Sequence, residues 1–184
     1  MSETETTVVD VLRFWFGPDA GRNGSERPEW FAEDEAFDRA CAEALGACSD
    51  RAVAGEHDHL AATPAGTLAL VLLLDQIPRN VHRGTAAAFA GDAAARRAAR
   101  RLIDRGFDRV LTSVQRLFLY LPFEHSEDPE DQERAVALFE RLGHPVWLEH
   151  AKRHRDIIAR FGRFPHRNAI VGRSTTPEEE AFLS

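Results

Sequence analysis

A run of seven apolar residues, Leu68 to Leu74, constrains the fold more than any other feature of the chain. Thr63 and Pro64 precede it. This pair is typical of a helix start, because threonine caps the first turn and proline suits the first helical position. A helix that is apolar on every side has no face for water, so other elements must surround it. We therefore expect this helix at the centre of the fold, ending near Asp75 because Pro78 interrupts it.

Helix start and stop signals recur along the rest of the chain, whereas the alternation typical of β-strands is nearly absent. Further helices are expected over residues 8–16, 33–48, 92–105, 108–121, 128–142 and 146–161, with a last turn over 176–183. Asp108 is expected to cap one of these helices and Pro122 to end it. Seven or eight helices with short connections predict an all-α bundle or array, forming a single domain over residues 1–184.

Composition and charge limit the classes of function. No segment approaches the roughly 20 apolar residues that span a bilayer. The acidic N-terminus lacks the basic and apolar regions of a secretory signal, so we expect a cytoplasmic protein with no membrane partner. The formal net charge is -7, which disfavours adhesion of the whole protein to nucleic acid.

One segment runs against this acidic background. Between Lys152 and Arg173 the chain has seven lysine or arginine residues and one acid. The centre of the segment, residues 160–168, interleaves four arginine or histidine side chains with two phenylalanines, and Gly162 and Pro165 restrict its backbone. Such a segment in an acidic protein indicates a place where a negatively charged group is held.

An acidic segment complements the basic one. From Glu124 to Glu133 there are six acids and no lysine or arginine. The acids from residue 128 onward suit the first turn of a helix, where the helix dipole favours negative charge. Glu124, His125 and Glu127 precede that helix and follow an apolar one, so they are better candidates for a site. The alternative is that the acidic and basic segments face each other and form ion pairs.

Two further side chains stand out by position. Asp75 lies at the negative end of a helix dipole, an unfavourable place that Arg79 or Arg83 would offset; the structural alternative is a carboxylate–arginine clamp. His154 lies near the basic segment and is a candidate proton carrier, although a core histidine is often structural. It shares a predicted buried helix face with Trp147, Ala151, Ile158 and Phe161. The spacing from His150 is typical of metal ligands, but the glutamate of a zinc-protease motif is missing and no metal is expected.

Two loops are similar to each other. Residues 78–84 and 165–173 both contain proline, then Arg-Asn, then arginine beside glycine. Amide and guanidinium donors presented together suit a carboxylate or a phosphate. We expect the two loops to converge, with Asn80 and Asn168 in one cavity. The competing interpretation is that each asparagine only caps a turn.

Taken together, the longer motifs resemble a bacterial family called domain of unknown function 924. The residues that carry the resemblance are 14–17 (FWFG), 30–31, 73–80 (LLDQIPRN) with 83–84, 121–128 (LPFEHSED) with Gln132, His154, 160–168 (RFGRFPHRN), 172–173 and 174–179. They span nearly the whole chain. The resemblance implies an all-α fold similar to tetratricopeptide-repeat arrays, although no 34-residue repeat is visible, and it implies no established reaction.

We interpret the chain as having a polar site for a small anion, a carboxylate or a phosphate. The candidate ligand contacts are Asp75, Arg79, Asn80, Arg83, His125, Arg160, Arg163, His166, Arg167, Asn168 and Arg173, and the acid–base candidates are Glu124, Glu127 and His154. No nucleophile motif, phosphate loop or dinucleotide fingerprint is present, so no cofactor is expected and catalysis is left open. The alternatives are a helical module that grips a peptide carboxylate, RNA contact through the Arg/Phe segment, and a structural charge network without a ligand.

Overall fold

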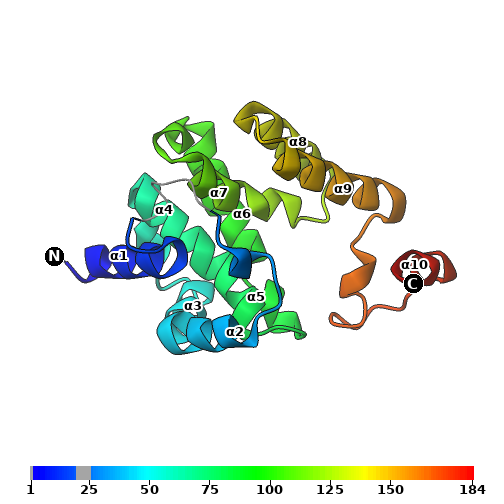
Figure 1. The fold of residues 1–184 in the computed structure, drawn as a ribbon, viewed down its shortest axis with the longest axis horizontal. Coiled ribbons are helices and arrows are strands. Elements are labelled where there is room, and N and C mark those ends of the chain that lie inside the picture. Colours follow the sequence, from blue (N-terminus) through cyan, green and yellow to red (C-terminus); the bar gives the residue numbers. More distant parts are fainter. Residues whose placement is uncertain (1, 20–25) are drawn as a thin grey trace. The chain divides into compact units, whose positions relative to one another are not determined.

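The computed structural model describes residues 2–19 and 26–184, and all regular structure among them is helical, which confirms the all-α prediction (Figure 1). The α-helices are α1 (Glu3–Phe16), α2 (Glu35–Cys41), α3 (Ala47–Val53), α4 (Pro64–Val71), α5 (Ile77–Val81), α6 (Asp92–Asp104), α7 (Ser113–Glu124), α8 (Pro129–Leu142), α9 (Pro145–Phe161) and α10 (Pro177–Leu183). A π turn, Ala42–Gly46, joins α2 to α3, and another, Leu72–Gln76, joins α4 to α5. Counting each joined pair once, the described residues form eight helices.

The chain divides into two compact units. The N-terminal unit comprises residues 1–83 and 87–122, and the C-terminal unit comprises residues 84–86 and 123–184. The first contains α1 to α6 and most of α7, and the second contains α8 to α10. That the whole chain forms a single domain stays a prediction. No helix in the described part of the chain has the length and apolar character needed to cross a membrane.

The core of the N-terminal unit is built around the apolar run. All residues from Leu68 to Leu74 are buried, as predicted. The Thr63 side chain caps α4 by accepting a hydrogen bond from the Gly66 backbone N–H at 3.0 Å. The expected helix end at Pro78 is wrong, because the helix runs on to Val81.

The π turn explains how the helix passes Pro78. Proline has no N–H and crowds the carbonyl four residues earlier, here that of Leu74. In the π turn the Ile77 N–H instead bonds to the Leu72 carbonyl, five residues back. The Leu73 carbonyl accepts the Ser49 hydroxyl at 2.7 Å. Hydrogen bonds outside the regular α-helical pattern thus compensate for the interruption of this pattern at Pro78.

The Leu74 carbonyl lies against Gly91, directly before α6. A methyl group at Gly91 would be 2.1 Å from the Leu74 oxygen, so glycine is required there by space alone. The π turn at residues 42–46 lies near the π turn at residues 72–76, because α3 packs on residues 72–76 and α5 packs on residues 42–46.

The expected helix cap at Asp108 is also wrong. Helix α7 begins at Ser113, and buried Asp108 accepts a hydrogen bond from the Tyr120 hydroxyl at 2.6 Å.

In the C-terminal unit α8 and α9 lie side by side (Figure 1). Asp128 caps α8 by accepting the Glu130 N–H at 2.8 Å, as the Asp-Pro pair predicted. Thr176 and Glu179 form a reciprocal capping box at the start of α10, each side chain accepting the backbone N–H of the other residue. Both helix starts are therefore confirmed.

Candidate functional site

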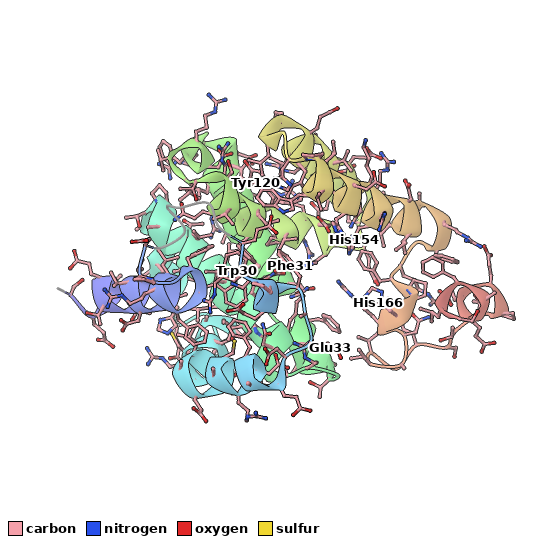
Figure 2. The ribbon with its side chains drawn as sticks, viewed as in Figure 1. Trp30, Phe31, Glu33, Tyr120, His154 and His166 are labelled. Atoms are coloured by element: carbon pink, nitrogen blue, oxygen red, sulfur yellow. The ribbon has the colours of Figure 1, made fainter. Side chains whose placement is uncertain are left out.

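The basic segment leaves α9 through a glycine turn. Gly162 has φ +69°, a left-handed conformation that glycine adopts at little cost, and its N–H bonds to the Ile158 carbonyl at 2.8 Å. The chain therefore turns sharply after Phe161. In Figure 2, His154 projects from α9 and His166 from the segment after this helix.

His154 pairs with a buried carboxylate. Its Nδ1 lies 3.0 Å from Oε1 of Glu124 and also 3.0 Å from the carbonyl oxygen of His150. A carbonyl oxygen only accepts hydrogen bonds, so Nδ1 carries the proton and Nε2 is the nitrogen left for exchange. The Glu124 side chain is 5% exposed, whereas that of His154 is 30% exposed. The arrangement is a buried carboxylate paired with a partly exposed imidazole.

The pair sets the proton affinity of His154. Burial opposes protonation of the ring, but the hydrogen bond and negative charge of Glu124 outweigh it and raise the pKa of His154 above 6.5. The prediction that His154 points inward is accurate in part, since its neighbours Ala151 and Ile158 on the same face are buried. Its ring is not enclosed by apolar groups alone.

Gln132 positions the end of α7, which carries Glu124. This glutamine is fully buried, and its side-chain amide donates to the carbonyls of Glu124 at 2.8 Å and Ser126 at 2.5 Å. The last carbonyls of a helix have no partner inside the helix, so a buried amide donor satisfies them. The expected helix end at Pro122 is slightly early, since α7 includes this proline and ends at Glu124.

Three side chains pack around the ring of Phe164, in the basic segment. The Phe164 side chain is fully buried, and the rings of His154 and His166 each lie 5.5 Å from its ring, centroid to centroid. The Arg167 guanidinium carbon is 4.6 Å from the same centroid. We call these four residues together with Glu124 the Phe164 cluster.

His166 differs from His154 in its surroundings. The pKa of His166 is lowered, first by desolvation and then by the positive charges of Arg167 and His154. Because His166 is exposed to solvent, its desolvation is incomplete. The positive charge of its neighbours is therefore the better supported cause of its lowered pKa. Within the described residues, no hydrogen-bond partner contacts its ring nitrogens. The cluster therefore holds two imidazoles whose proton affinities are shifted in opposite directions.

Glu127 and Arg173 clamp the backbone of Phe164. The two oxygens of Glu127 accept from the Arg173 guanidinium at 2.7 and 2.9 Å, and one of them also accepts the Phe164 N–H at 2.8 Å. Arg173 in turn donates to the Phe164 carbonyl at 3.2 Å. Partial burial opposes ionisation of Glu127, but Arg173 and the N–H lower the pKa of this carboxyl. Here the acidic and basic segments form an ion pair, as the alternative interpretation of these segments predicts.

A third carboxylate holds the C-terminal helix. Glu179 is 2% exposed and accepts from Arg163 at 2.6 and 2.8 Å, from the Thr176 N–H at 2.7 Å and from the Asn168 amide at 3.2 Å. Arg163 and the Thr176 N–H lower the pKa of Glu179 to about 2. Asn168 is fully buried, and its side-chain oxygen lacks a hydrogen-bond partner among the described residues.

The remaining predicted ligands fall into two groups. In the C-terminal unit, Arg160 pairs with Glu178 at 2.9 Å on the surface, and His125 is half-buried beside Glu124 in the chain. In the N-terminal unit, Arg79 bridges fully buried Asp75 at 3.1 Å and Asp92 at 2.9 Å, and this is the carboxylate–arginine clamp that the structural alternative predicts for Asp75.

The loop of Asn80 is tied down within its own unit. The Asn80 side chain donates a hydrogen bond to the Gln76 carbonyl at 2.9 Å and accepts one from Arg83. Arg83 also forms a bidentate ion pair with Asp38, at 2.7 and 2.8 Å. The similar loop of Asn168 belongs to the C-terminal unit. That the two loops share a cavity stays a prediction.

Sequence reasoning did not single out Phe164 or Glu179. Glu179 carries a signal, because Thr176 and Glu179 have the spacing of a capping box, but this pattern says nothing of Arg163 or Asn168. Phe164 gives no signal beyond its place in the Arg/Phe segment. In residues 2–19 and 26–184 no group of three or more histidine, cysteine or acidic side chains is placed to hold a metal ion.

These features define an all-α protein with charge-paired connections between its helices. The sequence profile of a family described as bacterial protein of unknown function (DUF924) matches residues 11–184, and the chain belongs to this family. A solved structure of a protein of unknown function from Agrobacterium tumefaciens is 43% identical, covers 99% of both chains and has a TM-score of 0.89. None of the curated proteins matches the chain.

Proposed function

We propose that the C-terminal unit binds a small anion, a carboxylate or a phosphate, at the Phe164 cluster, and that His154 exchanges a proton with it. The observation that carries the proposal is the contact of His154 with buried Glu124. This contact fixes the proton on Nδ1 and leaves Nε2 as the nitrogen available for exchange, on a side chain that is 30% exposed. Imidazoles held in this way by a carboxylate are suited to acid–base work near neutral pH.

The surroundings of the ring support an anion as the ligand. Arg167 and His166 contact the same phenylalanine as His154, so three nitrogen-bearing side chains gather around one ring. Arginine beside imidazole is suited to carboxylate and phosphate oxygens. Glu127, by contrast, has both oxygens engaged by the clamp, so we assign it to positioning the segment instead of acid–base chemistry.

The charge pairs narrow the set of ligand contacts. Arg160, Arg163 and Arg173 each bind a carboxylate of the chain itself, an arrangement suited to holding the segment in place. We centre the proposal on His154, His166 and Arg167 because these three side chains contact the same phenylalanine ring.

Binding of phosphate, sulfate, acetate and citrate, followed by calorimetry and by the histidine ring signals in NMR spectra, tests the proposal. We expect Arg167→Gln and His166→Gln to weaken binding about tenfold, the effect of losing one charge-assisted contact. The matched controls are Arg153→Gln and His150→Gln, two exposed positions of α9 outside the cluster. The proposal fails if no anion binds, or if the control variants weaken binding as much as the cluster variants.

A further inference from the structure

We infer that the exposed side of α6 and the turn after it bind an acidic peptide segment of a partner protein, one that carries apolar side chains beside its carboxylates. This surface belongs to the N-terminal unit and is separate from the Phe164 cluster. Between Arg96 and Arg109 the chain has six arginines, two aspartates and no other charged residue, although the formal net charge of the protein is -7.

Three of these arginines form a stripe along α6. Arg97, Arg101 and Arg105 are four residues apart, and all three are exposed. A rise of about 1.5 Å per residue places neighbours in the stripe about 6 Å apart along the helix axis. Within the described residues, none of the three side chains forms an ion pair. Arg96 and Arg100 do interact with other groups of the chain, so they are not part of the stripe.

The stripe differs from the basic segment of the C-terminal unit. In that segment Arg160, Arg163 and Arg173 each bind a carboxylate of the chain. The helix dipole favours cations in the last turn of α6, but it does not account for Arg97 in the middle of the helix. Guanidinium groups that the chain leaves without a carboxylate, at a regular spacing, are suited to the carboxylates of a partner.

Apolar side chains continue the surface beyond the stripe. Phe107 is 42% exposed and Val110 is 72% exposed, and both lie in the 3₁₀ turn directly after α6. The Arg105 guanidinium carbon is 4.6 Å from the centroid of the Phe107 ring, so the stripe reaches this turn. Arginine and aromatic side chains are enriched together in protein–protein interfaces. We call the following residues the α6 surface: Arg97, Arg101, Arg105, Phe107, Arg109 and Val110.

The charge of the whole protein favours a short acidic segment over a nucleic acid or a membrane. Both of these extend beyond the α6 surface, so they also meet the remainder of a protein whose net charge is negative. Bases stack on aromatic rings, but the Phe107 ring already holds Arg105, and Val110 has no ring. A short peptide contacts only the arginines and the two apolar side chains.

A synthetic peptide tests the inference. The probe is a fluorescent peptide of about 16 residues, long enough to form a helix, with glutamate at every fourth position and leucine beside each glutamate. Fluorescence anisotropy measures its binding to the full-length protein. Replacing the glutamates by glutamine should weaken binding about tenfold, the combined effect of several exposed ion pairs. Replacing the leucines by serine should also weaken it, because apolar contact with Val110 and Phe107 is lost.

Variants of the protein locate the contact. The double variant Arg97→Gln/Arg101→Gln should weaken peptide binding about fivefold. Its matched control is Arg39→Gln/Arg51→Gln, which removes the same charge from two exposed positions of the same unit. Because all four arginines are exposed, these replacements leave the core intact, and unchanged melting temperatures verify this.

Several outcomes overturn the inference. They are the absence of peptide binding, equal binding of the glutamate and glutamine peptides, and equal losses in the stripe variant and its control. Tighter binding of single-stranded RNA or of phosphatidylserine vesicles than of the peptide also overturns it, because the surface then recognises phosphate groups. Dimers that only the stripe variant breaks would assign the surface to a second copy of this chain instead.

Discussion

Glu127 and Arg173, which are 46 residues apart in the sequence, together bind both backbone groups of Phe164. The carboxylate takes the N–H and the guanidinium takes the carbonyl, while the two side chains bind each other. The backbone of Phe164 is thus held by this pair, while its ring contacts His154, His166 and Arg167. Loss of either clamp residue should therefore affect the whole cluster.

Arg173→Met should lower the free energy of unfolding by about 1–3 kcal/mol, the usual cost of leaving partly buried partners unsatisfied. Arg173→Lys should recover only part of this loss, because lysine cannot pair with both oxygens of Glu127 at once. The control is Arg160→Met, which breaks an exposed ion pair with Glu178 and should cost no more than about 1 kcal/mol. Urea unfolding measures all three, and equal losses in the two methionine variants would contradict the prediction.

Glu179 should make the protein sensitive to acid. Its pKa lies near 2 in the folded protein, below the ordinary value of 4.5, so the folded state favours the ionised carboxylate. The stabilisation is complete above about pH 4.5 and is lost as the pH falls toward 2. In Glu179→Gln the unfolding free energy should vary less with pH in this window than in the wild type. Glu178→Gln, at the exposed neighbouring position, should keep the wild-type profile.

Glu124 should raise the proton affinity of His154. In Glu124→Gln the negative charge is removed, so the pKa of His154 should fall, and NMR titration of the ring protons measures it. The raised pKa of His154 also has a consequence for stability. The contribution is complete below pH 6.5 and is lost as the pH rises through the pKa of the folded state. A His154 titration unchanged by the substitution would show that the carboxylate does not control the ring.

Gly91→Ala should destabilise the N-terminal unit, because the new methyl group meets the Leu74 carbonyl oxygen at 2.1 Å and two backbones must separate. A loss of about 1–3 kcal/mol is expected for such overpacking. Gly46→Ala is the matched control: its backbone is helical, its methyl group meets only a Val81 side chain at 4.0 Å, and alanine favours helix. Thermal unfolding of the two variants should differ clearly, and similar melting temperatures would argue against the close approach.

The helix starts were predictable from local signals, because each capping residue lies directly before its helix in the sequence. Thr63, Asp128 and Thr176 each lie directly before a proline, and each caps the helix expected there. Pro78 misled the prediction because the partners that let a helix pass a proline are far away in the sequence. Ser49 and Gly91 contact the carbonyls of Leu73 and Leu74, and no local pattern announces them.

The candidate site was predictable in its charges but not in its pairings. The complementary acidic and basic segments indicated contacts, and Glu124–His154 and Glu127–Arg173 are among them. Which acid binds which base depends on the tertiary arrangement, so the sequence could not separate Glu127, which clamps a backbone, from Glu124, which pairs with an imidazole. Glu179 lay outside the acidic segment, and its link to Arg163 is equally non-local.

The π turn at Leu72–Gln76 makes the helix tolerant of a lost residue. A π turn holds one more residue than an α turn, so deleting a single residue from it would restore regular winding. The later side chains, Arg79 and Asn80 among them, would keep their faces, because the wide turn already brings them to the positions that an α-helix one residue shorter would give. The extra residue instead leaves the Leu73 carbonyl for the Ser49 hydroxyl. Its loss would therefore disturb that distant contact and not the direction of the Pro-Arg-Asn segment.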